Sequence, residues 1–283
     1  MTIKAIVLVE NSVFGNLGAV AEHGWSVWLE TPSGPFLFDT GQSDTMQRNA
    51  AFFGLPLSAA NAVLVSHHHS DHTGGLLGAV HTLRQRPGRQ QVPVYAHPDL
   101  FKDSFSETKG KRRYIGLPHT RVALETAGAD FQFETGWREI APGMFMTGEV
   151  PRRTEFEIGD LAMKHYDPSG QIVVDPVRDD QTIVFDTPQG LFIVLGCSHA
   201  GLINILDYVV EQIGKRRIHT IMGGTHLGPV EQKQVDDTIA ALREFDIAHI
   251  GVSHCTGQKV AARMASEFGD RFFFCSVGTT VEV

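Results

Sequence analysis

The run His-His-His-Ser-Asp-His at residues 67–72 constrains the fold and function of this chain more than any other segment. The apolar residues 62–65 precede the run, and Gly74 and Gly75 follow it closely. This pattern predicts a short buried strand that ends at the histidines, and α/β proteins carry their ligand sites at strand ends. The run is internal and interrupted, so it is no artificial tag, and a solvated loop does not require a buried strand before it. We therefore expect a metal site rather than a polar surface loop.

The spacing His-x-His-x-Asp-His selects four candidate ligands from this run: His67, His69, Asp71 and His72. Imidazole nitrogens and carboxylate oxygens bind zinc, iron and manganese alike. The donor types therefore leave the identity of the metal open, with zinc as the first expectation.

Three later histidines occur in the same setting, just after a predicted strand and beside glycine: His199, His226 and His254. Because strand ends meet at one edge of an α/β sheet, we expect these side chains to converge with the first cluster. Cys197 and Cys255 lie close to two of them in the sequence. Each cysteine is expected to be a small buried side chain, and thiolate ligation of a metal is the alternative.

The composition is that of a globular protein with an acidic balance. The chain has 283 residues, of which 42% are hydrophobic and 20% charged, and its formal net charge is −8. This charge argues against a nucleic-acid partner, and no apolar stretch reaches the roughly 18–20 residues that a membrane helix requires. Three cysteines make no disulfide framework, and the first apolar run is too short for a signal peptide, which predicts a cytoplasmic protein. The oligomeric state stays open, a homo-oligomer included.

Short strands alternate with amphipathic helices along the sequence, which predicts the α/β class in a single domain of residues 1–283. Strands are predicted at residues 3–9, 25–31, 35–39, 62–66, 92–96, 182–187, 191–195, 218–222 and 247–252. Helices are predicted at residues 75–86, 201–213, 231–245 and 258–268. An irregular insertion is expected at about residues 87–178.

One hairpin pattern occurs twice in the sequence. Residues 26–39 and residues 182–195 both read as strand, Thr-Pro-x-Gly turn and strand. The offset between the two hairpins, applied to the start of the histidine run at residue 67, gives residues 223–226. Those residues would lie opposite the histidine run if two related halves face each other. Thr-Pro-x-Gly is a common turn, so chance similarity is the alternative to duplication.

The segment of residues 87–178 carries a basic stretch that includes Lys111, Arg112 and Arg113. Basic residues of this kind are typical of a solvated surface loop. The functional alternative is a basic lip that holds an anionic group of a substrate near the metal site.

The sequence resembles the metallo-β-lactamase superfamily over essentially the whole chain. The resemblance rests on the His-x-His-x-Asp-His spacing after a strand, the upstream Asp39-Thr40-Gly41 and the later strand-end histidines. The sequences around His199, His226 and His254 are similar to one branch of this family. That branch contains transferases that displace pyrophosphate from a pterin diphosphate.

The resemblance implies a four-layer αβ/βα sandwich, in which two mixed sheets are flanked by helices. It also implies two divalent metal ions, each bound by three side chains. The first ion would be held by His67, His69 and His199. The second would be held by Asp71, His72 and His254.

Further roles around the metals follow from the resemblance. Asp39 would orient a ligand histidine, and His23 would reach the rim of the pocket, with a surface histidine as the alternative. In a hydrolase, Asp71 would also be a catalytic proton acceptor. Many relatives carry an aspartate that bridges both metals, from a strand that ends in this chain at residues 223–226 without a carboxylate. His226 is then either a metal ligand or a catalytic group that hydrogen-bonds the substrate.

Three function classes are compatible with these residues. The first is a synthase-type transferase that acts on a phosphorylated small molecule, whose phosphate the basic stretch would bind. The second is a hydrolase of a phosphoester, lactone or thioester that uses a metal-bound hydroxide. The third is a non-catalytic metal- or ligand-binding protein, against which the complete ligand set argues. The branch motifs favour the first class.

Overall fold

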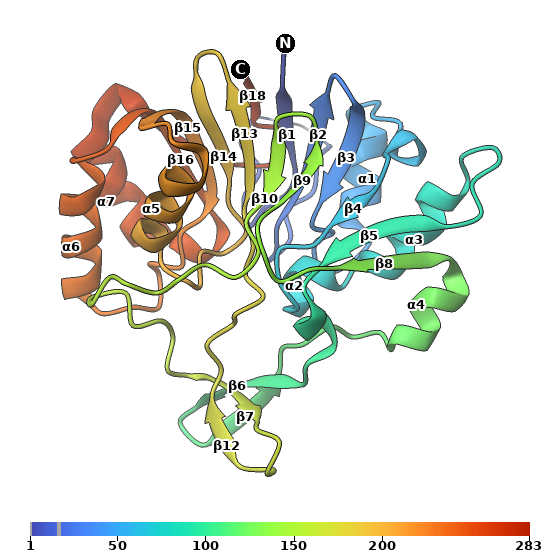
Figure 1. The fold of residues 1–283 in the computed structure, drawn as a ribbon, viewed down its shortest axis with the longest axis horizontal. Coiled ribbons are helices and arrows are strands. Elements are labelled where there is room, and N and C mark those ends of the chain that lie inside the picture. The colour runs from blue at the N-terminus through green and yellow to red at the C-terminus, as the bar shows by residue number, and fades with distance from the viewer. Residues whose placement is uncertain (1, 16–17) are drawn as a thin grey trace.

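Two seven-stranded sheets pack face to face at the centre of the described part of the chain, and helices cover both outer faces (Figure 1). The structure is a computed structural model that describes residues 2–15 and 18–283. The predicted four-layer sandwich of two mixed sheets flanked by helices is confirmed. No helix among the described residues has both the length and the apolar character needed to span a bilayer.

The first sheet is formed mainly by the N-terminal half of the chain. In spatial order its strands are β18 (Thr280–Glu282), β1 (Lys4–Val9), β2 (Ser26–Thr31), β3 (Gly34–Phe38), β4 (Val63–Leu64), β5 (Val92–Ala96) and β8 (Ala129–Phe133). The helices packed on it are α1 (Thr45–Phe52), α3 (Leu76–Arg84) and α4 (Arg121–Ala127). The short helix α2 (Ser70–Thr73) follows directly from the histidine run.

The second sheet is formed by the C-terminal half. In spatial order its strands are β9 (Arg138–Ala141), β10 (Met144–Met146), β13 (Ile183–Thr187), β14 (Gly190–Val194), β15 (Arg217–Gly224), β16 (Asp246–Ser253) and β17 (Phe272–Phe274). Its outer face is covered by α5 (Leu202–Ile213), α6 (Gln232–Leu242) and α7 (Gln258–Phe268).

The two sheets repeat one arrangement of strands. In each sheet an antiparallel hairpin, β2–β3 or β13–β14, is followed by three strands that run parallel to the second hairpin strand. The hairpins that share the Thr-Pro-x-Gly turn therefore occupy equivalent places, as the sequence pattern predicts. Consequently, strands β4 and β15 end at matching positions of the two sheets.

Alternation of side chains along the strands builds the layers of the core. In β1, Ala5 and Val7 point into the space between the sheets, while Ile6 and Leu8 point toward the helices of the first sheet. Phe192 of β14 likewise fills the inner layer and is fully buried. Strands that are covered on both faces read as continuous apolar runs, which is why the sequence identifies them well.

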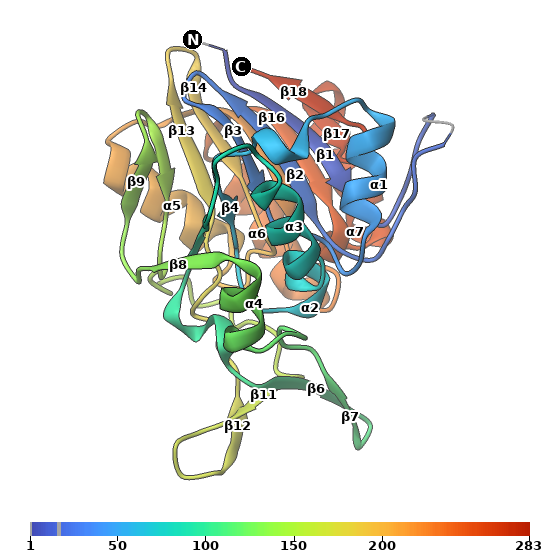
Figure 2. The same cartoon turned by 90° about the vertical axis from the view of Figure 1, so that its right-hand side faces the viewer.

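A third, four-stranded sheet projects from the end of the sandwich (Figure 2). In spatial order this small sheet contains β12 (Ile172–Val174), β11 (Met163–Tyr166), β6 (Ser104–Thr108) and β7 (Lys111–Tyr114). The sequence analysis predicts an irregular insertion at residues 87–178, and here the structure differs. That segment supplies the small sheet as well as β5, β8, β9, β10 and α4. Its short strands show no sustained apolar alternation, and β6 pairs with a strand far along the chain, so no local pattern reveals them.

Candidate metal centre

The loops that carry the predicted ligands all leave the same edge of the two sheets. His67 follows β4 of the first sheet, whereas His199, His226 and His254 follow β14, β15 and β16 of the second. Because these neighbouring strands run parallel, their ends bring the loops together, as is usual for α/β proteins. The site is therefore assembled from both halves of the sandwich.

A first ligand group consists of His67, His69 and His199. Their candidate ligand atoms lie within 4.8 Å of one another. His67 Nε2 is 3.0 Å from His69 Nδ1, and the His199 ring centroid is 4.8 Å from that of His67. All three side chains are buried. The sequence-based grouping of these residues thus agrees with their proximity in the structure.

The protonation states of this group suit a metal. Burial lowers the pKa of all three histidines well below the usual value, and neighbouring histidines lower it further, so the rings are neutral. A neutral imidazole is the form that coordinates a cation. No described protein atom is hydrogen-bonded to Nε2 of His69 or Nε2 of His199, although both atoms are buried. Buried polar atoms rarely lack a partner, so this donor set fits a divalent metal.

A second ligand group consists of His23, Asp71 and His254. Asp71 Oδ2 is 3.2 Å from His254 Nε2 and 3.2 Å from His23 Nε2, and the ligand atoms lie within 4.8 Å of one another. Burial would raise the pKa of Asp71, but hydrogen bonds from the two histidines outweigh it and hold this pKa well below the usual value. His23, predicted at the rim, is exposed and contributes to this group.

His72, predicted beside Asp71 and His254, lies between the two ligand groups. Its ring centroid is 4.2 Å from that of His67 and 5.2 Å from that of His254. Asp39 Oδ2 accepts a hydrogen bond from His72 Nδ1 at 2.7 Å, so the other ring nitrogen, Nε2, is the one that faces the site. Asp39 Oδ1 also accepts the backbone N–H of Ser66 at 2.7 Å. This is the geometry expected of a carboxylate that orients a ligand histidine.

The remaining histidine of the run, His68, points away from both ligand groups. Its Nδ1 is 2.7 Å from Asp179 Oδ2, and its Nε2 is 2.6 Å from Ser104 Oγ on β6. Lys102 extends this network, with its Nζ 2.8 Å from Asp175 Oδ1. The histidine run therefore has two roles. The residues on either side of His68 face the site, whereas the side chain of His68 hydrogen-bonds to the small sheet.

The backbone at the site is strained. Among the described residues, six non-glycine residues have positive φ, and four of them lie at the site: Asp39 (55°), Ser198 (61°), His226 (49°) and His254 (49°). Such conformations cost of order 1–3 kcal/mol each and concentrate at functional sites. Their clustering here shows that the fold holds these loops in place against their own preference.

A cavity of about 560 Å³ lies between the ligand groups and the small sheet. Its lining includes residues of both ligand groups and, on the small sheet, Ser106, Thr108 and Arg113. In the sheet register Ser106 pairs with Arg113, whereas Glu107 pairs with Arg112. Side chains alternate along a strand, so Arg113 shares the cavity face with Ser106.

Of the three residues of the predicted basic lip, Arg113 lines the cavity. Arg112 lies on the opposite face, where its Nε is 2.7 Å from Glu107 Oε2 and its guanidinium covers the Phe105 ring. Lys111 is exposed at the start of β7 and is not among the residues that line the cavity. The sequence could not separate Arg113 from Arg112, because strand register decides which of the two faces inward.

His226 lines the same cavity. Its ring centroid is 4.1 Å from that of His199, and neither ring nitrogen has a hydrogen-bond partner among the described residues. Its Nε2 is 3.6 Å from Oδ2 of Asp160, a cavity residue that the sequence analysis did not identify. Asp160 follows no strand, so it carries none of the signals that selected the other candidates.

A buried carboxylate supports the loop of His199. Glu157 accepts the backbone N–H groups of Ile203 and Asn204, each at 2.9 Å, in the first turn of α5. Burial raises the pKa of Glu157 from 4.5 to about 7, against the opposing effect of these hydrogen bonds. The segment that carries Glu157 also carries Asp160, so both anchor the same stretch of chain beside the site.

Comparison with known proteins places the chain among metal-dependent enzymes. The family profile described as "Metallo-beta-lactamase superfamily" matches residues 20–203. The 7,8-dihydropterin-6-methyl-4-(beta-D-ribofuranosyl)-aminobenzene-5'-phosphate synthase of Methanocaldococcus jannaschii is 28% identical over 279 residues, covering 95% of this chain and 93% of the synthase.

Solved structures show the same likeness. A crystal structure described as a metal-dependent hydrolase of the beta-lactamase superfamily has a TM-score of 0.83 and 28% identity, with 99% of each chain covered. Zinc-bound PqqB from Methylobacterium extorquens has a TM-score of 0.55 at 14% identity, covering 99% of this chain and 100% of PqqB, and this likeness shows the fold alone.

Replacing Asp39 should weaken metal binding. In Asp39→Asn the side chain can no longer accept hydrogen bonds at both oxygens from His72 and Ser66, so the imidazole loses its fixed orientation. We expect a loss of affinity of about 10–100-fold, measured by competition with a chromophoric chelator. Asp270→Asn, at an exposed position, is the control. Unchanged affinity in the Asp39 variant would refute the orienting role.

Glu157 should make stability depend on pH. Its pKa is higher in the folded chain than the ordinary 4.5, so the folded state holds more protons between that value and about 7. The free energy of unfolding therefore decreases as the pH rises through this range, by about 3 kcal/mol. In Glu157→Gln this part of the decrease should vanish, as measured by urea unfolding at about pH 5 and about pH 8. Parallel pH profiles for both proteins would contradict the assignment.

Proposed function

The chain belongs to the metallo-beta-lactamase superfamily, and from this premise we propose that it is a metal-dependent transferase that acts on phosphorylated small molecules. The proposed reaction joins a pterin diphosphate to a phosphorylated aminobenzene and releases pyrophosphate. The likeness to the dihydropterin synthase over 95% of the chain supports this branch. The observation that carries the proposal is the cavity that both ligand groups and Arg113 line together.

The proposed metal ligands come from both sheets. His67, His69 and His199 would hold one divalent cation, and Asp71, His72 and His254 would hold another, with zinc as the first candidate and iron or manganese as alternatives. If bound there, the two cations would supply positive charge that polarises a phosphoryl oxygen and stabilises the departing pyrophosphate. His23 sits at the outer side of the second position and is exposed to the cavity.

Arg113 is the proposed binding group for the phosphate of the substrate. It faces the cavity across from the ligand groups, and Ser106 and Thr108 place hydroxyl groups on the same face. A guanidinium can form two parallel hydrogen bonds to a phosphate, which fixes both its position and its orientation. The net charge of −8 supports a small anion held by this local cation rather than a nucleic acid along the surface.

Asp71 and His226 are the proposed catalytic side chains. Asp71 is held ionised by its two histidine neighbours and can accept the proton that the nucleophile loses. His226 presents ring nitrogens without protein partners to the cavity, and Asp160 is close enough to orient the ring. We propose that His226 hydrogen-bonds the substrate on the side opposite Arg113.

A hydrolase is the second candidate function. The similar structure described as a metal-dependent hydrolase is 28% identical over nearly the whole chain, an identity equal to that of the synthase. In this case the same cavity would take a phosphoester, lactone or thioester. The donor set does not decide between the two, because one scaffold hosts many reactions.

A substrate comparison separates these candidates. The purified protein is incubated with zinc, a pterin diphosphate and ribofuranosylaminobenzene phosphate, and the release of pyrophosphate is followed. The transferase predicts release that requires both substrates and stops when a chelator removes the metal. Turnover of a phosphodiester, lactone or thioester without any condensation would contradict the transferase and establish the hydrolase. No turnover of any of them, with metal bound, would contradict both.

Arg113 and Arg112 form a matched pair for testing the phosphate site. Arg113→Ala should raise KM for the phosphorylated substrate by about tenfold or more, because a hydrogen bond to a charged group is lost. Arg112→Ala removes the same charge from the neighbouring position on the opposite face of β7 and should change KM less than about twofold. Steady-state kinetics of the two variants measure this difference. Equal effects would indicate a general charge effect and no specific site.

A further inference from the structure

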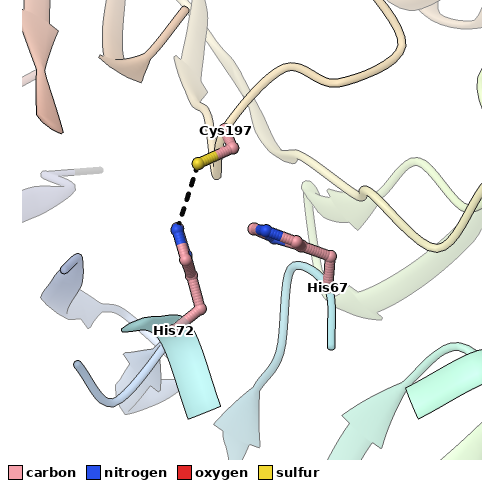
Figure 3. Close-up of side chains that lie close together, drawn as sticks. All are labelled: His67, His72 and Cys197. Atoms are coloured by element: carbon pink, nitrogen blue, oxygen red, sulfur yellow. Dashed lines mark hydrogen bonds between the residues drawn. The ribbon is translucent and has the colours of Figure 1, made fainter. Parts of the chain in front are cut away.

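The thiol of Cys197 lies where the two halves of the metal centre meet. Its Sγ is 3.1 Å from His72 Nε2, and the candidate ligand atoms of His67, His72 and Cys197 lie within 4.8 Å of one another. Figure 3 shows both imidazoles turned toward this sulfur. Cys197 forms a second group of the same kind with His199 and His226. One sulfur atom thus reaches histidines from both sheets.

The surroundings of Cys197 are those of a ligand rather than of a packing residue. Cys197 is 3% exposed, and Nε2 of His199, on a side chain that shares a ligand group with Cys197 and is 4% exposed, has no hydrogen-bond partner among the described residues. Cys275 provides the contrast, because it is buried within the apolar layer between the sheets. The sequence favours Cys197 as a small buried side chain. The polar neighbours of Cys197 in the structure instead support thiolate ligation of a metal.

The structure also explains why a carboxylate does not occupy the end of β15. A Cβ atom at Gly223 would lie 2.4 Å from the carbonyl oxygen of Leu195, and one at Gly224 would lie 2.6 Å from Cys255 Sγ. Neither position has room for a side chain, so the end of β15 offers no carboxylate to the site. Asp180 approaches His67 only from the Nδ1 side, at 3.9 Å.

We propose that Cys197 is a metal ligand that would bind a cation beside His67 and His72 as a thiolate. This inference rests on the proposed metal centre. On coordination the thiol would give up its proton to solvent, and the sulfur would donate an electron pair to the cation. A thiolate donor favours zinc over manganese or magnesium, so this ligand would also narrow the choice of metal.

Cobalt substitution tests the proposal directly. Cobalt(II) is loaded in place of the native metal, its content is measured by mass spectrometry, and the near-ultraviolet spectrum is recorded. A thiolate ligand produces a sulfur-to-cobalt charge-transfer band that histidine and carboxylate ligands do not. We expect the band in the wild-type protein and in Cys275→Ser and Cys255→Ser, and its loss in Cys197→Ser, which keeps the histidines.

Each outcome has a distinct meaning. Cobalt bound to the wild-type protein without the band overturns the role of Cys197 whether or not any variant folds, and leaves the metal-dependent function standing. A band that survives in Cys197→Ser, or disappears only in Cys255→Ser, overturns the assignment to this cysteine. Wild-type protein that binds no cobalt contradicts the proposed metal centre itself. Cys197→Ala, with folding checked by circular dichroism, controls for packing at this position.

Discussion

The close contact between one loop from each sheet is the constraint on which the site depends. A Cβ atom at Gly196, in the loop after β14, would lie only 2.5 Å from Cβ of Ser66, in the loop after β4. This approach sets His67 and its neighbours against Cys197 and His199. The ligand set is therefore complete only while the inner apolar layer holds the two sheets together. Binding of metal and folding of the sandwich should stabilise each other for this reason.

Burial and strain at this contact serve binding rather than stability. Burial keeps the imidazoles of the first ligand group neutral, and four left-handed non-glycine residues hold the loops that carry the ligands. The hydrogen-bonded supports, Asp39 behind His72 and Glu157 at the start of α5, fix these loops from outside. The hydrogen bond between His68 and Ser104 likewise fixes the small sheet, which carries Arg113. A bound cation would thus supply the partners that Nε2 of His69 and Nε2 of His199 lack among the described residues.

Much of the sandwich can be predicted from the sequence, because its strands are apolar on both faces and its helices have an apolar stripe. The ligands could be found because they follow such strands beside glycine. The small sheet could not be found, since β7 is fully exposed and β6 pairs with the distant β11. For the same reason the sequence could not separate Arg113 from Arg112, detect Asp160, or show that His68 points away from the site. These features depend on register and on contacts between distant segments, which periodicity does not contain.

In the proposed site both sheets contribute ligands to two neighbouring metal positions. Anomalous X-ray diffraction from crystals of the zinc-loaded protein would locate the bound ions. Two anomalous peaks are expected, one among His67, His69 and His199 and one beside Asp71, His72 and His254. Peaks elsewhere, or zinc-loaded crystals with no peak among these side chains, would contradict the proposed site.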